Sequence, residues 1–357
     1  MRGARVRPVT TLASRLKQQG LALGFDVVGI CAAGPSDHAE FYGRWIEAGY
    51  AGTMHYLARR IDERRDPRSL LPGCRSIVVA GLNSYDPDEA VTVPGHGLIA
   101  RFGRRDDYHQ IMRQRLLALL DWLVAETGHA PDTLGRVAVD SAPLLERELA
   151  MRAGLGWIGK NCNLINPRFG SWLLLGELLL EIELPPDEPW ERPHCGTCTR
   201  CLDACPAGAL VEPRLLDSRR CLAYLTIELK EAIPEELRPL VGQRIFGCDV
   251  CQEVCPWNQR LSQAGSDPLF RPRAGLTRPS LLELMALNDE GFRSRFGGSP
   301  ILRAKRRGLL RNVAVALGNW GNAAARPALS AALDDPEPLV REHSLWALGR
   351  IDSDGAP

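Results

Sequence analysis

The sequence lacks a long apolar segment. Its longest apolar stretch, Trp172 to Leu180, is interrupted by Gly176 and Glu177, and it is far shorter than the roughly 20 residues of a membrane-spanning helix. The basic residues near the N-terminus are not followed by an apolar core, so we expect no secretory signal. These absences predict a cytoplasmic protein with no membrane segment.

Net charge and compositional bias are also small. Lys and Arg number 44 against 43 Asp and Glu, for a net charge of +1, so any contact with nucleic acid must come from a local patch. The 357 residues suffice for two or three domains. Residues 154–161 contain three glycines but match neither a Walker A motif nor a complete dinucleotide fingerprint, so nucleotide binding has weak support.

Cysteine is plentiful by contrast. In a reducing compartment, cysteines are more often metal ligands or catalytic groups than disulfides. Seven of the eleven form two runs, Cys195-x-x-Cys198-x-x-Cys201-x-x-x-Cys205-Pro206 and Cys248-x-x-Cys251-x-x-x-Cys255-Pro256. The first run has the spacing of a bacterial-type ferredoxin, in which three cysteines hold one [4Fe–4S] cluster and the fourth ligates another. Two such clusters predict one-electron transfer.

Two clusters need eight thiolate ligands, and Cys221, between the two runs, is the natural eighth. The crossed pattern then assigns to cluster one Cys195, Cys198, Cys201 and Cys255, and to cluster two Cys205, Cys221, Cys248 and Cys251. A pair of structural zinc sites is the alternative, but zinc sites rarely use a triple run that ends in Cys-Pro. Cys31, Cys74 and Cys162 have no cluster role in this assignment.

Three domains are expected. Apolar runs and helical periodicity alternate up to about residue 180, which predicts an α/β domain over 1–182. A ferredoxin-like domain with two [4Fe–4S] clusters follows over 183–265. Residues 310–319 resemble residues 341–350, and each segment contains Ala-Leu-Gly, which predicts a small α-helical, HEAT-like domain over 266–357. A plain helical hairpin is the alternative for this last part.

A basic run without acidic residues lies in the third domain. Residues 293–311 contain Arg293, Arg295, Arg303, Lys305, Arg306, Arg307 and Arg311, with no Asp or Glu among them. This run predicts contact with the phosphate backbone of RNA or another polyanion. The alternative is a solvated helix face.

Asp140 follows a short strand and precedes a helix. A carboxylate at a strand end lies where α/β domains place ligands, so Asp140 is a candidate general acid or base. From spacing alone, a helix N-cap is an equal alternative. Asp107, Tyr108 and His109 begin a longer helix, as a cap or as hydrogen-bonding groups for a polar ligand.

Taken together, these segments resemble the epoxyqueuosine reductase family over about residues 10–350. The resemblance is carried by Gly52–Leu57, Asp107–His109, Asp140–Pro143, Gly154–Asn161, Cys195–Pro206, Cys221–Glu228 and Gly247–Asn258. It implies a reductive-dehalogenase-like, cobalamin-binding first domain. The implied enzyme is a cytoplasmic oxidoreductase that reduces the epoxide of epoxyqueuosine to queuosine at the wobble position of tRNA. One departure is Cys162, where the family commonly has threonine; we expect the thiol simply to fill the same space.

The resemblance also implies cofactors, partners and site residues. The cofactors are cobalamin, resting as cob(II)alamin, and two [4Fe–4S] clusters; the partners are a tRNA with a GUN anticodon and an external low-potential electron donor, and the enzyme is expected to be a monomer. Asp140 is implied as proton donor. The expected cobalamin contacts are Tyr56, Arg64, Gly103, Asp140, Asn163 and Ala223, and the expected substrate contacts are Asp107, Tyr108, Arg147, Lys305, Arg306 and Arg307.

Two rival functions remain at this point. An iron–sulfur electron-transfer subunit would explain the cysteine runs but not the large domain before them or the basic run after them. A corrinoid reductive dehalogenase would explain the first domain but gives no reason for the basic run.

Overall fold

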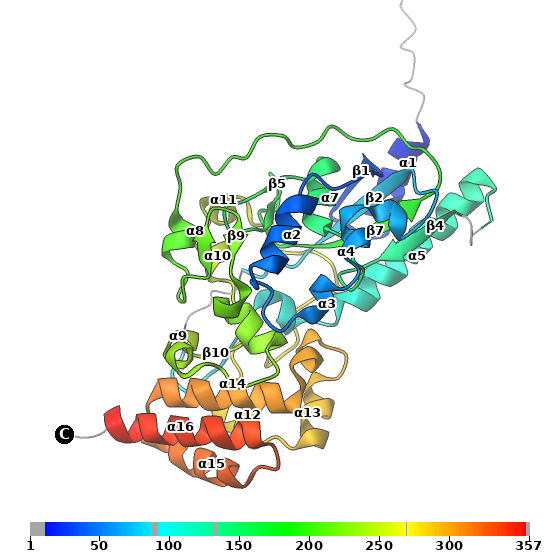
Figure 1. The fold of residues 1–357 in the computed structure, drawn as a ribbon. Helices are drawn as coiled ribbons and strands as arrows, with labels where there is room; N and C mark the ends of the chain where they lie inside the picture. Colours follow the sequence, from blue (N-terminus) through cyan, green and yellow to red (C-terminus); the bar gives the residue numbers. More distant parts are fainter. Residues whose placement is uncertain (1–10, 88–91, 131–133, 269, 355–357) are drawn as a thin grey trace, which may run out of the picture.

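A four-stranded antiparallel sheet forms the centre of the N-terminal region (Figure 1). In the computed structural model, which describes residues 11–87, 92–130, 134–268 and 270–354, its strand order is β1-β2-β7-β4. The strands are β1 (Val27–Ala32), β2 (Ser76–Asn83), β4 (Gly135–Ala138) and β7 (Leu173–Leu180). The basic N-terminal residues considered above lie outside the described ranges.

Helices cover both faces of this sheet. The helices α1 (Leu12–Ala22) and α5 (Tyr108–Thr127) share one apolar core with Val78 and Ala80 of β2. The helix α7 (Glu146–Arg152) packs on the opposite face with Ile77 and Val79. Because successive strand residues point to opposite faces, β2 supplies both cores. The expected α/β architecture is confirmed.

Several short helices and strands complete the N-terminal region around this sheet. They are α2 (Ala39–Glu47), α3 (His55–Ala58), α4 (Ile61–Arg65), η1 (Pro67–Ser69), β3 (Leu98–Ile99), η2 (Arg101–Arg104), β5 (Trp157–Ile158) and β6 (Leu164–Ile165). The phenol of Tyr224 hydrogen-bonds to Thr53, with 2.9 Å between its oxygen and the Thr53 nitrogen. This contact joins the loop before α3 to the cysteine-rich region.

The cysteine-rich region is built from very short elements. They are α8 (Arg200–Asp203), β8 (Leu210–Glu212), β9 (Leu215–Leu216), η3 (Ser218–Arg220), the π-helix η4 (Tyr224–Glu228), η5 (Glu235–Leu237), α9 (Arg238–Val241), β10 (Arg244–Phe246), α10 (Val250–Glu253) and α11 (Pro256–Leu261). The strand β10 pairs in parallel with β3. A strand of the N-terminal region is thus shared with the second region.

The C-terminal region is helical. It contains α12 (Leu281–Met285), α13 (Asp289–Phe296), η6 (Pro300–Ala304), α14 (Lys305–Trp320), η7 (Ala323–Ala325), α15 (Arg326–Ala331), η8 (Ala332–Asp334) and α16 (Pro338–Asp354). The two predicted repeat segments lie on α14 and α16, which run side by side in Figure 1. A Cβ atom on Gly318 would approach Ala347 to 2.9 Å, so the glycine permits this close packing.

Buried polar side chains of α14 join this region to the second. The Asn312 amide donates to the carbonyls of Thr226 and Ile245, both at 2.8 Å. The fully buried Arg311 guanidinium donates to the carbonyls of Leu229 and Glu231. Among the described residues no helix is long and apolar enough to cross a membrane.

Candidate active site and iron–sulfur site

The eight predicted cluster ligands lie in two groups. Burial, followed by the proximity of Cys195 and Cys255, raises the pKa of the Cys201 thiol to about 11. Burial, then Cys248 and Cys221, raises the pKa of Cys251, and Cys205 adds to the effect. These neighbours are the same two sets that the crossed pattern assigns. Ligation itself stays a prediction.

Backbone N–H groups point at several of these sulfur atoms. The Ala209 nitrogen lies 3.2 Å from Cys205 Sγ. Ala223 and Tyr224 donate to Cys221, and Trp257 and Asn258 donate to Cys255. Such hydrogen bonds stabilise thiolates and tune the potential of an iron–sulfur cluster. At Cys221 and Cys255 these hydrogen bonds lower the pKa of the thiol, but burial is the larger effect and raises it above its ordinary value.

A cavity of about 200 Å³ lies among the cluster-one cysteines. It is lined by Cys195, Cys198, Cys201 and Cys255, with Lys160 and Trp257 among the other residues. Within the ranges that the structure describes, no three Cys, His, Asp or Glu side chains converge closely enough for one metal ion. Thiols spread around a cavity suit a multi-iron cluster better than the single zinc ion of the alternative interpretation.

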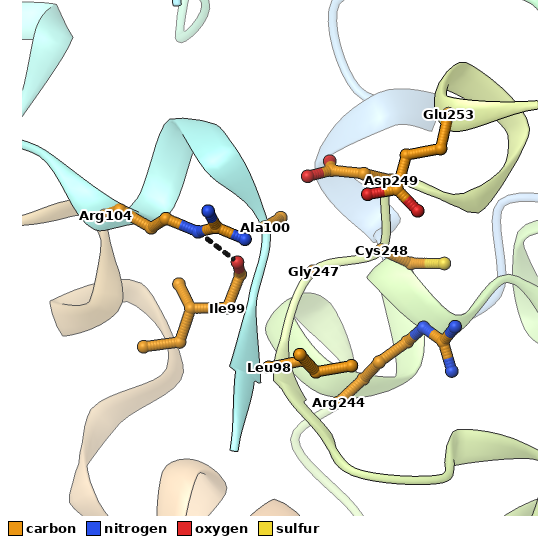
Figure 2. Close-up of a pocket in the computed structure, with 9 residues that line it drawn as sticks. All are labelled: Leu98, Ile99, Ala100, Arg104, Arg244, Gly247, Cys248, Asp249 and Glu253. Atoms are coloured by element: carbon orange, nitrogen blue, oxygen red, sulfur yellow. Dashed lines mark hydrogen bonds between the residues drawn. The ribbon is translucent and has the colours of Figure 1, made fainter. Parts of the chain in front are cut away.

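A second cavity, of about 30 Å³, lies beside Cys248 (Figure 2). Figure 2 shows Arg104 donating to the Ile99 carbonyl on one side and Asp249 and Glu253 on the other, with 2.8 Å between the Arg104 Nε and the carbonyl oxygen. A cavity of this size has room for little more than water. It is not a site for an organic cofactor.

Asp140 lies in a strained turn just after β4. Its φ angle is +50°, in the left-handed region that is uncommon for residues other than glycine. Its backbone nitrogen lies 2.7 Å from Glu146 Oε1, so the first residue of α7 holds the turn in place. Asp140 does not cap α7, because the N-cap position is Leu145. Strain of this kind concentrates at functional sites.

His109 bridges two carboxylates. Its Nδ1 lies 2.6 Å from Asp107 Oδ1, and its Nε2 lies 3.0 Å from Asp140 Oδ2. Its ring stacks on Tyr108, with 4.1 Å between ring centroids. The start of α5 and the turn after β4 are thereby connected through one imidazole.

The charge states follow from these contacts. Burial pushes the pKa of Asp140 upward, but the hydrogen bond and charge of His109 outweigh it and hold this pKa below its ordinary value. Burial opposes the charge of His109, but Asp107 and Asp140 prevail and raise the pKa of the imidazole to about 9. At neutral pH the pair is Asp140 carboxylate and His109 imidazolium.

Two further carboxyl groups lie behind the Asp140 turn. Burial and the charge of Asp140 raise the pKa of Glu146 to about 8. Burial, then the charge of Glu146, raises the pKa of Glu177, which lies in the middle of β7 beside Ala138 of β4. Both oxygens of Glu177 are buried, and within the described part of the chain neither has a hydrogen-bond partner. Glu146 and Glu177 are therefore protonated at neutral pH, and they leave the negative charge on Asp140.

The predicted substrate-binding residues of the N-terminal region already make contacts within the protein. Asp107 caps α5 through the His109 backbone N–H as well as binding the His109 ring. Tyr108 is buried, and its hydroxyl hydrogen-bonds to Asp140. Arg147 donates to the Cys162 carbonyl at 2.8 Å, so it connects α7 to the loop between β5 and β6. Cys162 is half-buried with a φ of +65°, and burial raises the pKa of its thiol to about 11.

Tyr56, a predicted cobalamin contact, lies near Asp140. Its side chain is among the exposed ones, and the Asp140 carboxylate contributes to its raised pKa, after burial and Glu228. The amide nitrogen of Asn163 lies 4.0 Å from Cys251 Sγ. Together with Ala223 beside Cys221, these residues extend from the Asp140 site to cluster two.

Arg64 and Gly103 do not fit the role expected of them. Arg64 is buried, and its guanidinium donates to the Arg59 carbonyl at 2.9 Å. A Cβ atom on Gly103 would lie 2.8 Å from the Phe246 ring, so this glycine makes room for protein packing. Both the Arg64 side chain and the Gly103 backbone are buried.

Acidic side chains from other segments of the chain pair with several members of the basic run. Arg303 pairs with Glu228, Arg306 with Asp335, and Arg295 with Glu283. The expectation that Arg306 contacts a phosphate is not supported, because its side chain is only 10% exposed and is already paired. Arg311 is buried as described above. Lys305 is exposed, Arg307 is half-buried, and among the described residues no acid pairs with either.

Arg303 was not expected near the first region's site. Its guanidinium lies 5.6 Å from the centre of the Tyr56 ring, and its charge lowers the pKa of Asp140. The C-terminal region thus contributes a cation to the Asp140 site. The roles of His109 and Glu146 were also missed, although the Asp107-Tyr108-His109 segment had been singled out.

Fold and site together define an oxidoreductase that combines a double iron–sulfur domain with an acid–base site and a helical-repeat end. Family models match at residues 64–141 ("Epoxyqueuosine reductase QueG, DUF1730"), 194–258 ("4Fe-4S double cluster binding domain") and 300–357 ("HEAT repeats"). The chain is 43% identical to epoxyqueuosine reductase of Pseudomonas aeruginosa over 95% of its length and 94% of that protein. The Escherichia coli enzyme is also 43% identical, over 95% of this chain and 89% of its own. The chain belongs to the epoxyqueuosine reductase family.

Solved structures agree with this assignment. A selenomethionine-labelled epoxyqueuosine reductase superposes with a TM-score of 0.87 at 33% identity, covering 95% of this chain and 90% of that one. An epoxyqueuosine reductase bound to an epoxyqueuosine-modified tRNA-Tyr stem loop gives 0.86 at 33% identity over the same shares. A Bacillus subtilis structure, described with its catalytic aspartate loop swung out of the active site, gives 0.85 at 32%, again over 95% and 90%. The predicted family, the three-part fold and the HEAT-like end are confirmed.

Proposed function

We propose that this chain reduces the epoxide of epoxyqueuosine in tRNA and yields queuosine. The observation that carries the proposal is an acid–base site, Asp140 and His109, held by Glu146 of α7, while the next residue of that helix, Arg147, lies close enough to Cys221 of cluster two to lower its pKa. Removing an epoxide oxygen as water consumes two electrons and two protons. Such a reaction needs both a path for electrons and a group that supplies protons.

The two groups of thiols provide the electron path. Cluster one would accept electrons from an external low-potential donor, because its cysteines line a cavity rimmed by exposed His194 and Arg260. Cluster two would lie further inside, with Cys251 beside Asn163. Electrons passing from the first group to the second approach the Asp140 site.

Asp140 is the group we assign to protonate the epoxide oxygen as its carbon–oxygen bond breaks. Glu146 holds the turn, so the carboxylate has a fixed direction. Tyr108 donates a further hydrogen bond to the same carboxylate. Asp107 would act mainly through His109, to which it is already bound.

A corrinoid is the cofactor that we propose as the link between the Asp140 site and cluster two. Tyr56, Asn163 and the backbone at Ala223 would contact it, whereas Arg64 and Gly103 would not. Cobalamin, when bound, supplies a metal centre that can pass electrons singly to a carbon–oxygen bond. Asp140 and His109 would hold and transfer the protons on the substrate side.

The substrate would be held as part of a tRNA anticodon loop. Lys305 and Arg307, which pair with no acid among the described residues, offer cations for its phosphates, and Arg303 brings positive charge to the site itself. The modified base must leave the stack to reach Asp140, as in other enzymes that act on bases.

The visible absorption of anaerobically purified protein tests the cofactor part of this proposal. Iron–sulfur and corrinoid bands together support a reductase. Iron–sulfur bands alone, with no uptake of added cobalamin, would instead indicate an electron carrier. In an Asp140→Asn variant we expect both sets of bands to persist and turnover to be lost; near-normal turnover would contradict the role of Asp140.

A further inference from the structure

Both ring nitrogens of His109 face carboxylate oxygens. Nδ1 lies 2.6 Å from Asp107 and Nε2 lies 3.0 Å from Asp140. An ionised carboxylate only accepts hydrogen bonds, so the ring satisfies both partners only when both of its nitrogens carry hydrogen. In a neutral ring, the nitrogen without hydrogen would face a carboxylate with its lone pair, and the two would repel each other. With both carboxyl groups ionised, this geometry requires an imidazolium.

The surroundings maintain this charge distribution. His109 is held by Asp107 and Asp140 and stacks on Tyr108, while the charged and titratable groups next to Asp140 are Tyr108, Glu146, Glu177 and Arg303. The two carboxylates outweigh burial and raise the pKa of His109 to about 9. The positive charges of His109 and Arg303 help to keep the pKa of Asp140 low, against burial. Asp140 thus begins the reaction without a proton of its own.

We propose that the Asp107–His109 pair stores the proton that Asp140 delivers, so that Asp140 is the last carrier of this proton and not its source. The inference rests on the proposed function, since it concerns protonation of the same epoxide. His109 does not touch the substrate, and it acts through Asp140 as a proton-holding and positioning residue.

The proton transfer balances without an additional reagent. The Nε2–H proton moves to Asp140 Oδ2, and the carboxylic acid so formed gives a proton to the epoxide oxygen as the carbon–oxygen bond breaks. Neutral His109 then regains a proton from solvent. The two electrons come from the external donor through the clusters, the second proton comes from solvent, and the oxygen leaves as water.

Substrate binding supplies the driving force for the first transfer. The Asp140 side chain is 57% exposed in the structure, although protein crowds it on several sides. A bound base would cover it, and desolvation favours the neutral form of a carboxyl group. The proton on His109 thereby becomes easier to transfer when the substrate is in place.

Histidine-selective ¹⁵N NMR of the oxidised holoenzyme tests the proton storage without turnover. The His109 signals are assigned by their loss in a His109→Gln variant. We expect two protonated ring nitrogens at pH 7.5 and titration near pH 9. Removing one carboxylate, in Asp107→Asn, should move this titration to lower pH. A neutral His109 ring at pH 7.5 would overturn the proposal.

The pH profile of single turnover tests the transfer itself. The wild-type rate should stay level up to about pH 9 and fall above it. Glutamine at 109 can still donate to Asp140 but stores no proton, so the rate of His109→Gln should fall by about tenfold per pH unit through the neutral range. At pH 8 we expect a loss of about 10²-fold or more.

His129→Gln is the matched control, because His129 is exposed and lies beyond the C-terminal end of α5. Iron and corrinoid contents establish that each variant is loaded. A His109→Gln profile parallel to that of wild type would overturn the proposal even if both rates were lower. Failure of the wild-type enzyme to convert epoxyqueuosine would instead refute the proposed function, and the NMR result would be unaffected.

Discussion

Replacing Lys305 and Arg307 together by alanine should weaken tRNA binding by removing phosphate contacts. Lys305 is exposed, Arg307 is half-buried, and neither has an acidic partner among the described residues. If each contacts one phosphate, the slope of log K against log salt should become shallower by about 1.4–1.8, since each contact contributes roughly 0.7–0.9. Fluorescence anisotropy of a labelled anticodon stem-loop across a salt series measures this slope.

Arg306→Ala is the matched control for that experiment. Its guanidinium is paired with Asp335, and the two side chains are 10% and 8% exposed. Removing it should leave the salt slope unchanged but destabilise the C-terminal region by roughly 1–3 kcal/mol, because Asp335 loses its ion pair and retains the backbone N–H of Glu337 as a donor. An unchanged slope in the double variant, or a shallower one in Arg306→Ala with unaltered stability, would refute this placement of the RNA surface.

Three further predictions concern the clusters, the catalytic turn and the third region. Cys221→Ser should lower the iron content from about eight to about four per chain, whereas Cys162→Thr should leave it unchanged; equal iron in both variants would remove Cys221 from cluster two. Glu146→Leu deletes the acceptor for the Asp140 backbone N–H. The loss of this hydrogen bond, about 1 kcal/mol, should lower turnover about fivefold. Glu146→Gln keeps an acceptor oxygen and should retain normal turnover. Arg311→Met leaves the carbonyls of Leu225, Leu229 and Glu231 without their donor, and thermal unfolding should report a loss of about 3–6 kcal/mol; the exposed Arg293→Met should unfold as wild type.

The iron–sulfur region was the most predictable part of the molecule, because its ligands are marked by local spacing. Only Cys221 had to be found by counting, and the structure places it beside Cys205 and Cys251. The helical repeat was readable for a similar reason, since close packing of α14 on α16 requires a small residue such as Gly318.

The acid–base site was less predictable, because its contacts span distant segments. His109 reaches Asp140 across 31 residues, and only the packing of α5 against the sheet brings them together. The prediction from the basic run was wrong for Arg306 for the same reason. The acid that neutralises Arg306 lies 29 residues away, in the loop between η8 and α16. A local count of charge does not detect such a partner.

Cobalamin contacts were the least predictable, because they came from resemblance alone. Arg64 and Gly103 contribute to protein packing, which no spacing indicates. Tyr56 on α3 and Asn163 in the loop between β5 and β6 are better placed, near Asp140 and Cys251 respectively.

Mass analysis of tRNA nucleosides after anaerobic incubation with the reduced enzyme tests the proposed function most directly. Starting from epoxyqueuosine-containing tRNA, we predict loss of the epoxyqueuosine signal and gain of queuosine, lighter by one oxygen atom. Neither change should occur with Asp140→Asn. An unchanged epoxyqueuosine signal with fully loaded, reduced wild-type enzyme would contradict the proposed reaction.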